Sequence, residues 1–326
     1  MSIDLNKAEE HFIELMRSLN KNDQQKFLSF IIKEWKVESS VFYNHTGDDT
    51  YDCDKDNDTD YPIFMLNTIV FDIKQKVPFN AILPSENIIK PLSGLNSDCD
   101  SDITFHMDLF LYDYDDLTEL ENNKQLQRYY CLDCGSRNTE SLIYISHSIS
   151  RKALYYMFNI CLPKLKGKTI LDVGSRLGAV LYGAYVYTDA QRIIGVEMNE
   201  EFCNLQNDII HKYKMGGRIT IFHNRIENVP KVIEESDVII LNNPFEFYLS
   251  KDIQIDIWKF LKATIKKGTI LVTCPSIDII FRTLQLDDSI ETWLKPYERY
   301  SNKIHDLHTA MNGDESFNIM SCYEIF

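Results

Sequence analysis

The chain has 326 residues, an apolar content of 44% and a formal net charge of −15, so its length suits one elaborated α/β domain or two modest ones. No apolar run approaches the roughly 18 residues of a membrane helix, and the acidic N-terminus is not typical of a signal sequence. We therefore expect a soluble protein, cytoplasmic or nuclear, whose eight cysteines are reduced.

The excess of acid lies almost entirely in the first half of the chain. Residues 1–150 contain 13 Lys and Arg against 27 Asp and Glu, a net charge of −14, whereas residues 151–326 contain 21 against 22. Proteins that hold nucleic acid neutralise phosphates with Lys and Arg, so this charge disfavours a nucleic-acid substrate bound by this chain alone. It suits a basic protein substrate, although acidic runs usually only solvate loops.

The sequence pattern of the N-terminal half predicts a small α+β region. Helical periodicity marks residues 5–36, and residues 46–60 have almost no apolar content, which predicts a mobile loop. The aspartates of that loop are not spaced for calcium, because Ile63 stands where a bidentate glutamate is needed. Further elements are predicted as strands at 62–73, 103–112 and 141–146, a short helix at 112–122 and an amphipathic helix at 149–163.

From Lys168 onward, apolar runs and amphipathic segments alternate in the manner of a doubly wound α/β domain. The predicted strands are 169–173, 192–196, 218–223, 236–241, 269–273, 292–297 and 317–325. The predicted helices are 178–188, 199–214, 252–266 and 276–285. We therefore predict an acidic region over residues 1–145 and a nucleotide-binding α/β domain over residues 146–326.

The start of that domain predicts a nucleotide site. The first strand runs into the turn Asp-Val-Gly-Ser-Arg-Leu-Gly at 172–178, and the second strand ends at Glu197, where a ribose would lie. A dinucleotide fingerprint needs a third glycine between its first and last, so that the backbone can approach a pyrophosphate. Arg176 occupies the position between Gly174 and Gly178, which excludes a dinucleotide.

The turn, together with the Gly-Val-Glu that ends the second strand, resembles the first two motifs of the class I, seven-β-strand S-adenosylmethionine-dependent methyltransferases. The resemblance covers roughly half of the chain and implies a Rossmann-like methyltransferase sheet of seven mostly parallel strands, the last antiparallel. It implies S-adenosylmethionine as the cofactor, with Gly174 leaving room for its methionine part and Glu197 binding both ribose hydroxyls. The other implied cofactor residues are Asp172, Ser175, Gly178, Met198, Asn224, opposite the adenine amino group, and Asn242.

A second motif follows the fourth strand, where residues 242–248 read Asn-Asn-Pro-Phe-Glu-Phe-Tyr. It is partly similar to the N-P-P-F motif of enzymes that methylate adenine or glutamine, although Asn243 replaces the first proline. It also resembles the N-N-x-x-F pattern of the non-SET histone-lysine methyltransferases, the disruptor of telomeric silencing family. The resemblance implies Asn242, Asn243 and Phe245 as catalytic residues; the alternative is a simple turn after a buried strand.

The chemistry of the second motif fits methylation of nitrogen. Two asparagines can orient an amine, and Phe245, Phe247 and Tyr248 can line a dry channel. A lysine must lose its proton first, at a cost of roughly 4–5 kcal/mol at neutral pH, and such a channel lowers that cost. We therefore predict an N-methyltransferase acting on a protein side chain such as lysine. The alternatives are a nucleic-acid or small-molecule N-methyltransferase and a non-catalytic methyltransferase-like partner.

Cys131 and Cys134 form the one C-x-x-C pair. A structural zinc site needs four ligands, and His106 and His147 are the residues that could complete it. In the absence of a second cysteine pair we predict no metal, and two ordinary thiols in a turn.

Overall fold

The computed structural model describes residues 7, 11, 12, 14, 15, 18, 19, 27, 60–91, 104–132, 138–286, 292–297 and 320–326. By its contacts the chain divides into two compact units, residues 1–61 and residues 62–326. The residues described in the first 27 positions are helical apart from Leu19. The predicted mobile loop at 46–60 lies outside the described residues as far as position 59.

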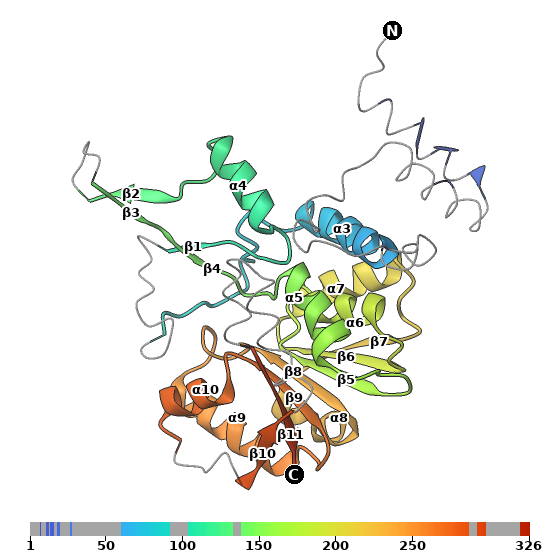
Figure 1. The fold of residues 1–326 in the computed structure, drawn as a ribbon, viewed down its shortest axis with the longest axis vertical. Helices are drawn as coiled ribbons and strands as arrows, with labels where there is room; N and C mark the ends of the chain where they lie inside the picture. Colours follow the sequence, from blue (N-terminus) through green and yellow to red (C-terminus); the bar gives the residue numbers. More distant parts are fainter. Residues whose placement is uncertain are drawn as a thin grey trace, which may run out of the picture. The chain divides into compact units, whose positions relative to one another are not determined.

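The second unit is built on a seven-stranded sheet with the order β10-β11-β9-β8-β5-β6-β7 (Figure 1). Its strands are β5 (Thr169–Val173), β6 (Arg192–Glu197), β7 (Ile219–His223), β8 (Val238–Asn242), β9 (Ile270–Cys274), β10 (Leu294–Pro296) and β11 (Ser321–Ile325). Strands β5 to β9 pair in parallel, and β11 runs antiparallel to both of its neighbours. The predicted doubly wound, mostly parallel sheet of seven strands is thus confirmed, antiparallel last strand included.

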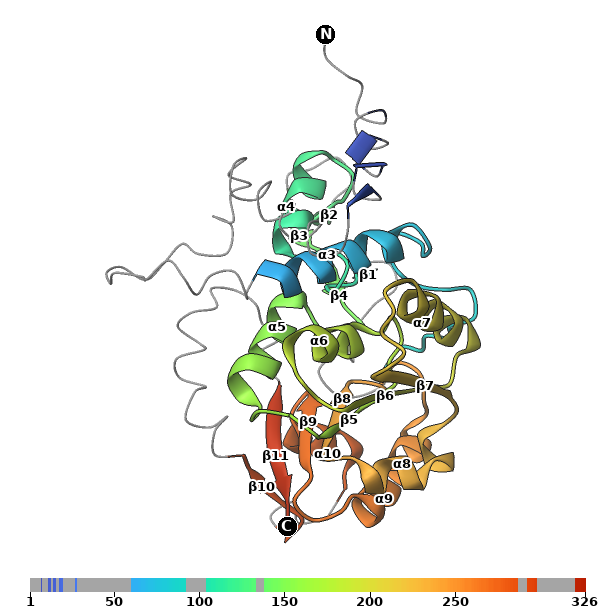
Figure 2. The same ribbon diagram turned by 90° about the vertical axis from the view of Figure 1, so that its right-hand side faces the viewer.

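Two apolar layers cover the sheet because side chains alternate along each strand. Ile170 and Ile193 pack in one core cluster, whereas their neighbours Leu171 and Ile194 pack in the other. Helices of the first layer lie on one face and helices of the second on the opposite face (Figures 1 and 2). The first layer comprises α5 (Arg151–Tyr156), its π-helical continuation (Met157–Cys161), α6 (Ala179–Tyr187) and α7 (Glu200–Lys212). The second comprises α8 (Pro230–Glu235), α9 (Lys251–Thr264) and α10 (Ile277–Leu284).

Residues 62–73, predicted as a strand, are helical and belong to α3 (Asp60–Lys74). The aromatic and β-branched content of this segment favoured a strand, but its buried residues recur at helical spacing. Leu66, Ile69, Val70 and Ile73 are buried in the first core cluster, and Phe71 is exposed. Tertiary burial of one helical face therefore outweighs the local β-propensity.

The predicted strand at 103–112 was also too long, because only β1 (Thr104–His106) forms. It ends where the carboxylate of Asp108 accepts hydrogen bonds from the backbone N–H groups of Phe110 (3.1 Å) and Leu111 (3.4 Å). This aspartate turn gives the backbone an alternative to strand pairing. The remaining elements are α4 (Tyr114–Asn122), β2 (Tyr129–Cys131), β3 (Thr139–Ser141) and β4 (Ile143–Ile145), which pairs in parallel with β1.

Helix α8 was not predicted from the sequence. The other α-helices of the α/β domain, with α5 and its π-helical continuation taken together, match their predicted bounds to within two residues at each end. Residues 62–145 and 146–326 both lie in the second unit, in which α3 packs with the helices of the first layer. The division between residues 1–145 and 146–326 stays a prediction. Among the described residues, no helix has the length and apolar character that a membrane crossing requires.

Candidate functional site

A cavity of about 230 Å³ opens at the carboxyl ends of β5, β6 and β8. In an open α/β sheet, ligands bind at this edge, where the chain switches from one side of the first strand to the other. Here the switch lies between β5 and β8, which are neighbours in the sheet. Five of the predicted cofactor residues line the cavity: Gly174, Glu197, Met198, Asn224 and Asn242.

The carboxylate of Glu197 is buried in the wall of the cavity at the end of β6. Its Oε2 accepts a hydrogen bond from the backbone N–H of Arg176 (2.9 Å), and its Oε1 accepts one from that of Asn199 (2.8 Å). Burial raises the pKa of this carboxyl, and the two backbone donors oppose the shift. Each carboxylate oxygen has a second lone pair, so the held carboxylate retains capacity for the hydroxyl groups of a ligand.

Position 174 requires glycine for two reasons, its backbone conformation and the closeness of Pro244. Its φ of +72° is left-handed, and a Cβ built on it would lie 2.7 Å from the Cβ of Pro244. The resemblance implied that this glycine leaves room for the methionine part of a cofactor. In the structure, Pro244 occupies the space beside its Cα, and the glycine thereby joins the turn after β5 to the loop after β8.

Asp172, Ser175 and Gly178 are not among the residues that line the cavity. The Ser175 hydroxyl donates to Oε1 of Gln206 (2.8 Å), which ties the turn to α7. Gly178 caps α6 in the left-handed conformation, and Asp172 is buried, where desolvation and then the neighbouring Glu197 raise its pKa. Their observed contacts support the turn, and a direct role with a cofactor stays a prediction for all three.

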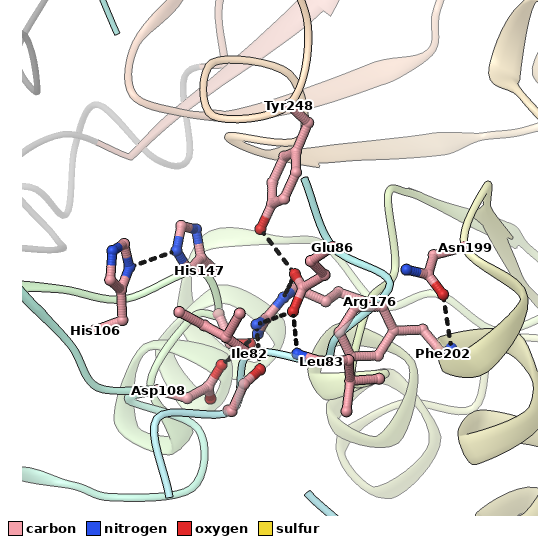
Figure 3. A network of polar contacts seen from close by, with 12 residues as sticks. Ile82, Leu83, Glu86, His106, Asp108, His147, Arg176, Asn199, Phe202 and Tyr248 are labelled. Carbon is pink, nitrogen blue, oxygen red and sulfur yellow. Dashed lines mark hydrogen bonds and ion pairs between the residues drawn. The ribbon is translucent and has the colours of Figure 1, made fainter. Parts of the chain in front are cut away.

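Arg176, for which the sequence offered no explanation, is the centre of a buried network (Figure 3). Its Nε donates to Oε1 of Glu86 (2.9 Å) and its Nη2 to Oε2 of the same carboxylate (3.1 Å). Its Nη1 donates to Oδ2 of Asp108 (2.9 Å), and its Nη2 also contacts the carbonyl oxygen of Ala81. The guanidinium lies over the ring of Phe202, 5.0 Å from its centroid. The side chain thus points away from the turn and onto the segment that precedes the sheet.

That segment supplies one wall of the cavity, which sequence reasoning missed. Ser85, Glu86 and Asn87 all line the cavity, although they precede β5 by more than 80 residues. Their stretch of sequence, Pro-Ser-Glu-Asn, has no motif that would have indicated a ligand. One indirect signal was present in the sequence, because Arg176 stands at a position where the related motif has glycine.

The loop after β8 places its predicted catalytic residues at the cavity. Asn242, Asn243 and Phe245 all line it, with Asn243 in the left-handed conformation at φ +47°. The side-chain amide of Asn243 donates to Oε2 of Glu246 (2.7 Å). Phe245 packs edge-on against Trp258 at 6.3 Å. The loop thus brings two amides and an aromatic ring to the cavity, and their catalytic role stays a prediction.

Of the aromatic channel that we predicted, Phe245 and Tyr248 line the cavity, whereas Phe247 is buried and is not among the lining residues. Phe247 instead packs edge-on against His147 with ring centroids 5.0 Å apart. The hydroxyl of Tyr248 donates to Oε1 of Glu86 (3.3 Å), so the β8 loop also joins the Arg176 network.

His147 completes the wall beside Tyr248 and is coupled to His106. The Nε2 of His147 and the Nδ1 of His106 lie 2.9 Å apart, and the rings stack. Burial, with the charge of Arg176, lowers the pKa of His147 to about 2 and also lowers that of His106. The lowered pKa values favour the neutral form of both rings, which contact each other.

Within the described part of the chain, no three His, Cys, Asp or Glu side chains form a group that would hold a metal ion. Cys134 lies outside that part, so the prediction about the C-x-x-C pair stays a prediction.

Asn224 follows β7 and lines the cavity with its neighbour Arg225. Its Oδ1 accepts hydrogen bonds from the backbone N–H of Arg225 (2.9 Å) and from the side chain of Asn228 (2.9 Å). The amide is thus oriented by local contacts.

No protein-family model and no curated protein matches the sequence. Three similar solved structures are enzymes of low identity. A precorrin-6y C5,15-methyltransferase from Geobacter metallireducens is 10% identical, with 46% of this chain and 76% of that one covered and a TM-score of 0.37. An RNA methyltransferase from Salinibacter ruber, in complex with S-adenosyl-L-homocysteine, is 15% identical, with 39% and 76% covered and a TM-score of 0.32.

An S-adenosylmethionine-dependent O-methyltransferase from Thermotoga maritima is 20% identical, with 43% of this chain and 50% of that one covered and a TM-score of 0.31. The finer resemblance to the disruptor of telomeric silencing family is not shown by these structures and stays a prediction.

Proposed function

We propose that the chain is an S-adenosylmethionine-dependent methyltransferase. The observation that carries the proposal is the buried Glu197 carboxylate in the wall of a cavity at the topological switch of the sheet, fixed by two backbone N–H groups. A charged acceptor at the end of the second strand is what a ribose diol requires.

The residues around the cavity fit the parts of this cofactor. Glu197 would face the diol, and Asn224, which follows the next strand, would lie beside the adenine. To accept from the adenine amino group, the Asn224 Oδ1 would have to exchange one of its hydrogen bonds from Arg225 and Asn228. Val196, Ile226 and Phe202 give the cavity an apolar side for the purine. When bound, S-adenosylmethionine supplies a methyl group activated on a sulfonium, so the chain needs to contribute positioning and no nucleophile of its own.

We further propose nitrogen as the methyl acceptor. The support is the side-chain amide of Asn242 at the end of β8, with Phe245 and Tyr248 beside it. The amide oxygen can accept a hydrogen bond from an N–H group, and the aromatic rings exclude water. Because its pKa is lowered, His147 adds no positive charge to the wall beside Tyr248, which suits an amine that must lose its proton before transfer.

For the acceptor molecule, we propose a basic protein segment, such as one that carries a lysine. The support is the net charge of −14 in residues 1–150. An acidic surface attracts a cationic chain and repels phosphate. An RNA or a small metabolite as acceptor is the other outcome of the experiment below.

The first test is calorimetric titration of the purified chain with S-adenosylhomocysteine. We expect binding by the natural sequence and a dissociation constant about 30-fold higher for Glu197→Gln, which loses charge from the hydrogen bonds to the diol, about 2 kcal/mol. Glu200→Gln is the matched control, because Glu200 is exposed on the adjacent turn and does not line the cavity. Absence of binding by the natural sequence would favour a non-catalytic scaffold.

The second test identifies the acceptor. Tritiated S-adenosylmethionine is incubated with the chain and with separate protein, RNA and metabolite fractions. Label in protein, released as methyl-lysine on hydrolysis, is expected. Label confined to RNA or metabolites would refute the protein acceptor while leaving the methyltransferase assignment intact.

A further inference from the structure

Residues 81–89, called here the wall segment, are fixed to the sheet domain at three places. Arg176 binds Glu86 through two hydrogen bonds and contacts the carbonyl of Ala81. Ser85 contacts Asn199 and Glu201 at the start of α7. The backbone N–H of Ile89 donates to the carbonyl of Phe247 (2.8 Å) in the β8 loop. The segment therefore touches the turn, the helix and the loop that surround the cavity.

The tie through Arg176 is buried. The side chains of Arg176, Glu86 and Asp108 are 8%, 3% and 2% exposed, so all three charges are withdrawn from water. Charges that are buried this far persist only with specific partners. The arginine fork supplies them, since it donates to both carboxylates at once, which a lysine ammonium cannot do in the same geometry.

We infer that Ser85, Glu86 and Asn87 form part of the cofactor-binding site, and that Arg176 is the positioning residue that holds them there. The inference rests on the proposed function. The arginine at position 176 is then not evidence that the turn has lost the ability to bind a cofactor. It replaces the middle glycine of the turn because this chain closes its cavity with the wall segment, and its backbone N–H still donates to Glu197 as the turn requires.

Restoring the glycine with Arg176→Gly should weaken cofactor binding rather than improve it, because the wall segment loses its anchor. We expect the dissociation constant for S-adenosylhomocysteine to rise about tenfold or more, with tenfold corresponding to about 1.4 kcal/mol. Turnover at saturating S-adenosylmethionine should fall much less than the KM for it rises.

Because Arg176→Gly removes the ion-pair partner of two buried carboxylates, that variant can fail to fold, and Glu86→Gln provides the second test. It keeps the shape of the side chain and leaves the Arg176 to Asp108 pair in place. The same rise in dissociation constant is expected. Asp113→Asn is the matched control, since it breaks an ion pair with Arg151 (2.6 Å) and does not line the cavity. It should bind within twofold of the natural sequence.

Hydrogen exchange separates a binding role from a merely structural one. In the natural sequence, S-adenosylhomocysteine should slow exchange of the backbone amides of residues 85–87, and Glu86→Gln should weaken that protection. Unchanged affinity in Glu86→Gln, or no protection of these amides by the bound ligand, would overturn the inference while the proposed function stands. If the natural sequence fails to bind S-adenosylhomocysteine at all, the proposed function fails, and the inference falls with it before any variant is made.

Discussion

Gly174→Ala tests how the turn after β5 is joined to the loop after β8. The alanine must adopt a φ of +72°, and its Cβ would lie 2.7 Å from the Cβ of Pro244. The left-handed conformation costs an L-residue about 1–2 kcal/mol, and forcing a methyl into packed surroundings costs about 1–3 kcal/mol more. We expect the free energy of unfolding to fall by about 2–5 kcal/mol, measured by urea denaturation without cofactor.

Gly167→Ala is the matched control for this substitution. Gly167 has nearly the same φ, +75°, in the turn before β5, but a Cβ built there meets no atom within 4 Å. It should therefore cost only the backbone term, about 1–2 kcal/mol. The difference between the two variants isolates the contact with Pro244. Equal losses of stability at the two positions would refute the view that Pro244 fills the space beside Gly174.

Three other substitutions test separate parts of the structure. Asn242→Ala should leave the affinity for S-adenosylhomocysteine within about threefold of its natural value and lower kcat on the labelled acceptor by roughly 10–100-fold, the range for a lost positioning contact. Equal turnover would remove Asn242 from the catalytic residues. Gly195→Ala should lower the unfolding free energy by about 1–3 kcal/mol, because its Cβ would lie 2.8 Å from Ser175 Oγ and 2.9 Å from Leu181 Cδ1. A melting temperature equal to that of the natural sequence would contradict that packing. His147 stays neutral in the folded state, with its pKa lowered to about 2, so below pH about 6.5 the unfolded chain binds more protons and stability falls as the pH falls. His147→Gln should remove up to about 1.4 kcal/mol per pH unit of that slope between pH 6.5 and 5, and identical slopes in urea titrations would contradict a buried neutral ring.

Much of the sheet domain could be predicted from the sequence because its elements are locally encoded. Short apolar runs such as 169–173 are bounded by turn residues and are buried on both faces, and every one of the seven predicted strands has a counterpart in the sheet. The place of Glu197 followed from the same local order, since the residue that ends the second strand must lie at the carboxyl edge. In residues 62–73 the spacing of the buried residues decides the element. Local propensity predicted a strand there, and the structure has a helix.

Of the residues at the candidate site, some could likewise be predicted from the sequence and others could not. The positions of Gly174, Glu197, Asn224 and Asn242 at one edge follow from sequence order and parallel topology, because the carboxyl ends of parallel strands meet there. The wall segment could not be predicted this way, since its contacts with the sheet domain join residues that are at least 90 apart in the chain. No periodicity or motif encodes a contact of that separation.

By itself, then, the sequence determined the β-α-β unit over residues 169–197, the succession of strands along the chain and the acid at the end of the second strand. These features depend on residues that are close together in the chain, so their spacing can be read from the sequence. Only the tertiary structure decided that Pro244 fills the space at Gly174 and that Arg176 is bound by Glu86 and Asp108. Those outcomes depend on which surfaces meet when the layers pack. A buried arginine is stabilised by carboxylates, and only the tertiary structure shows which carboxylates lie next to it.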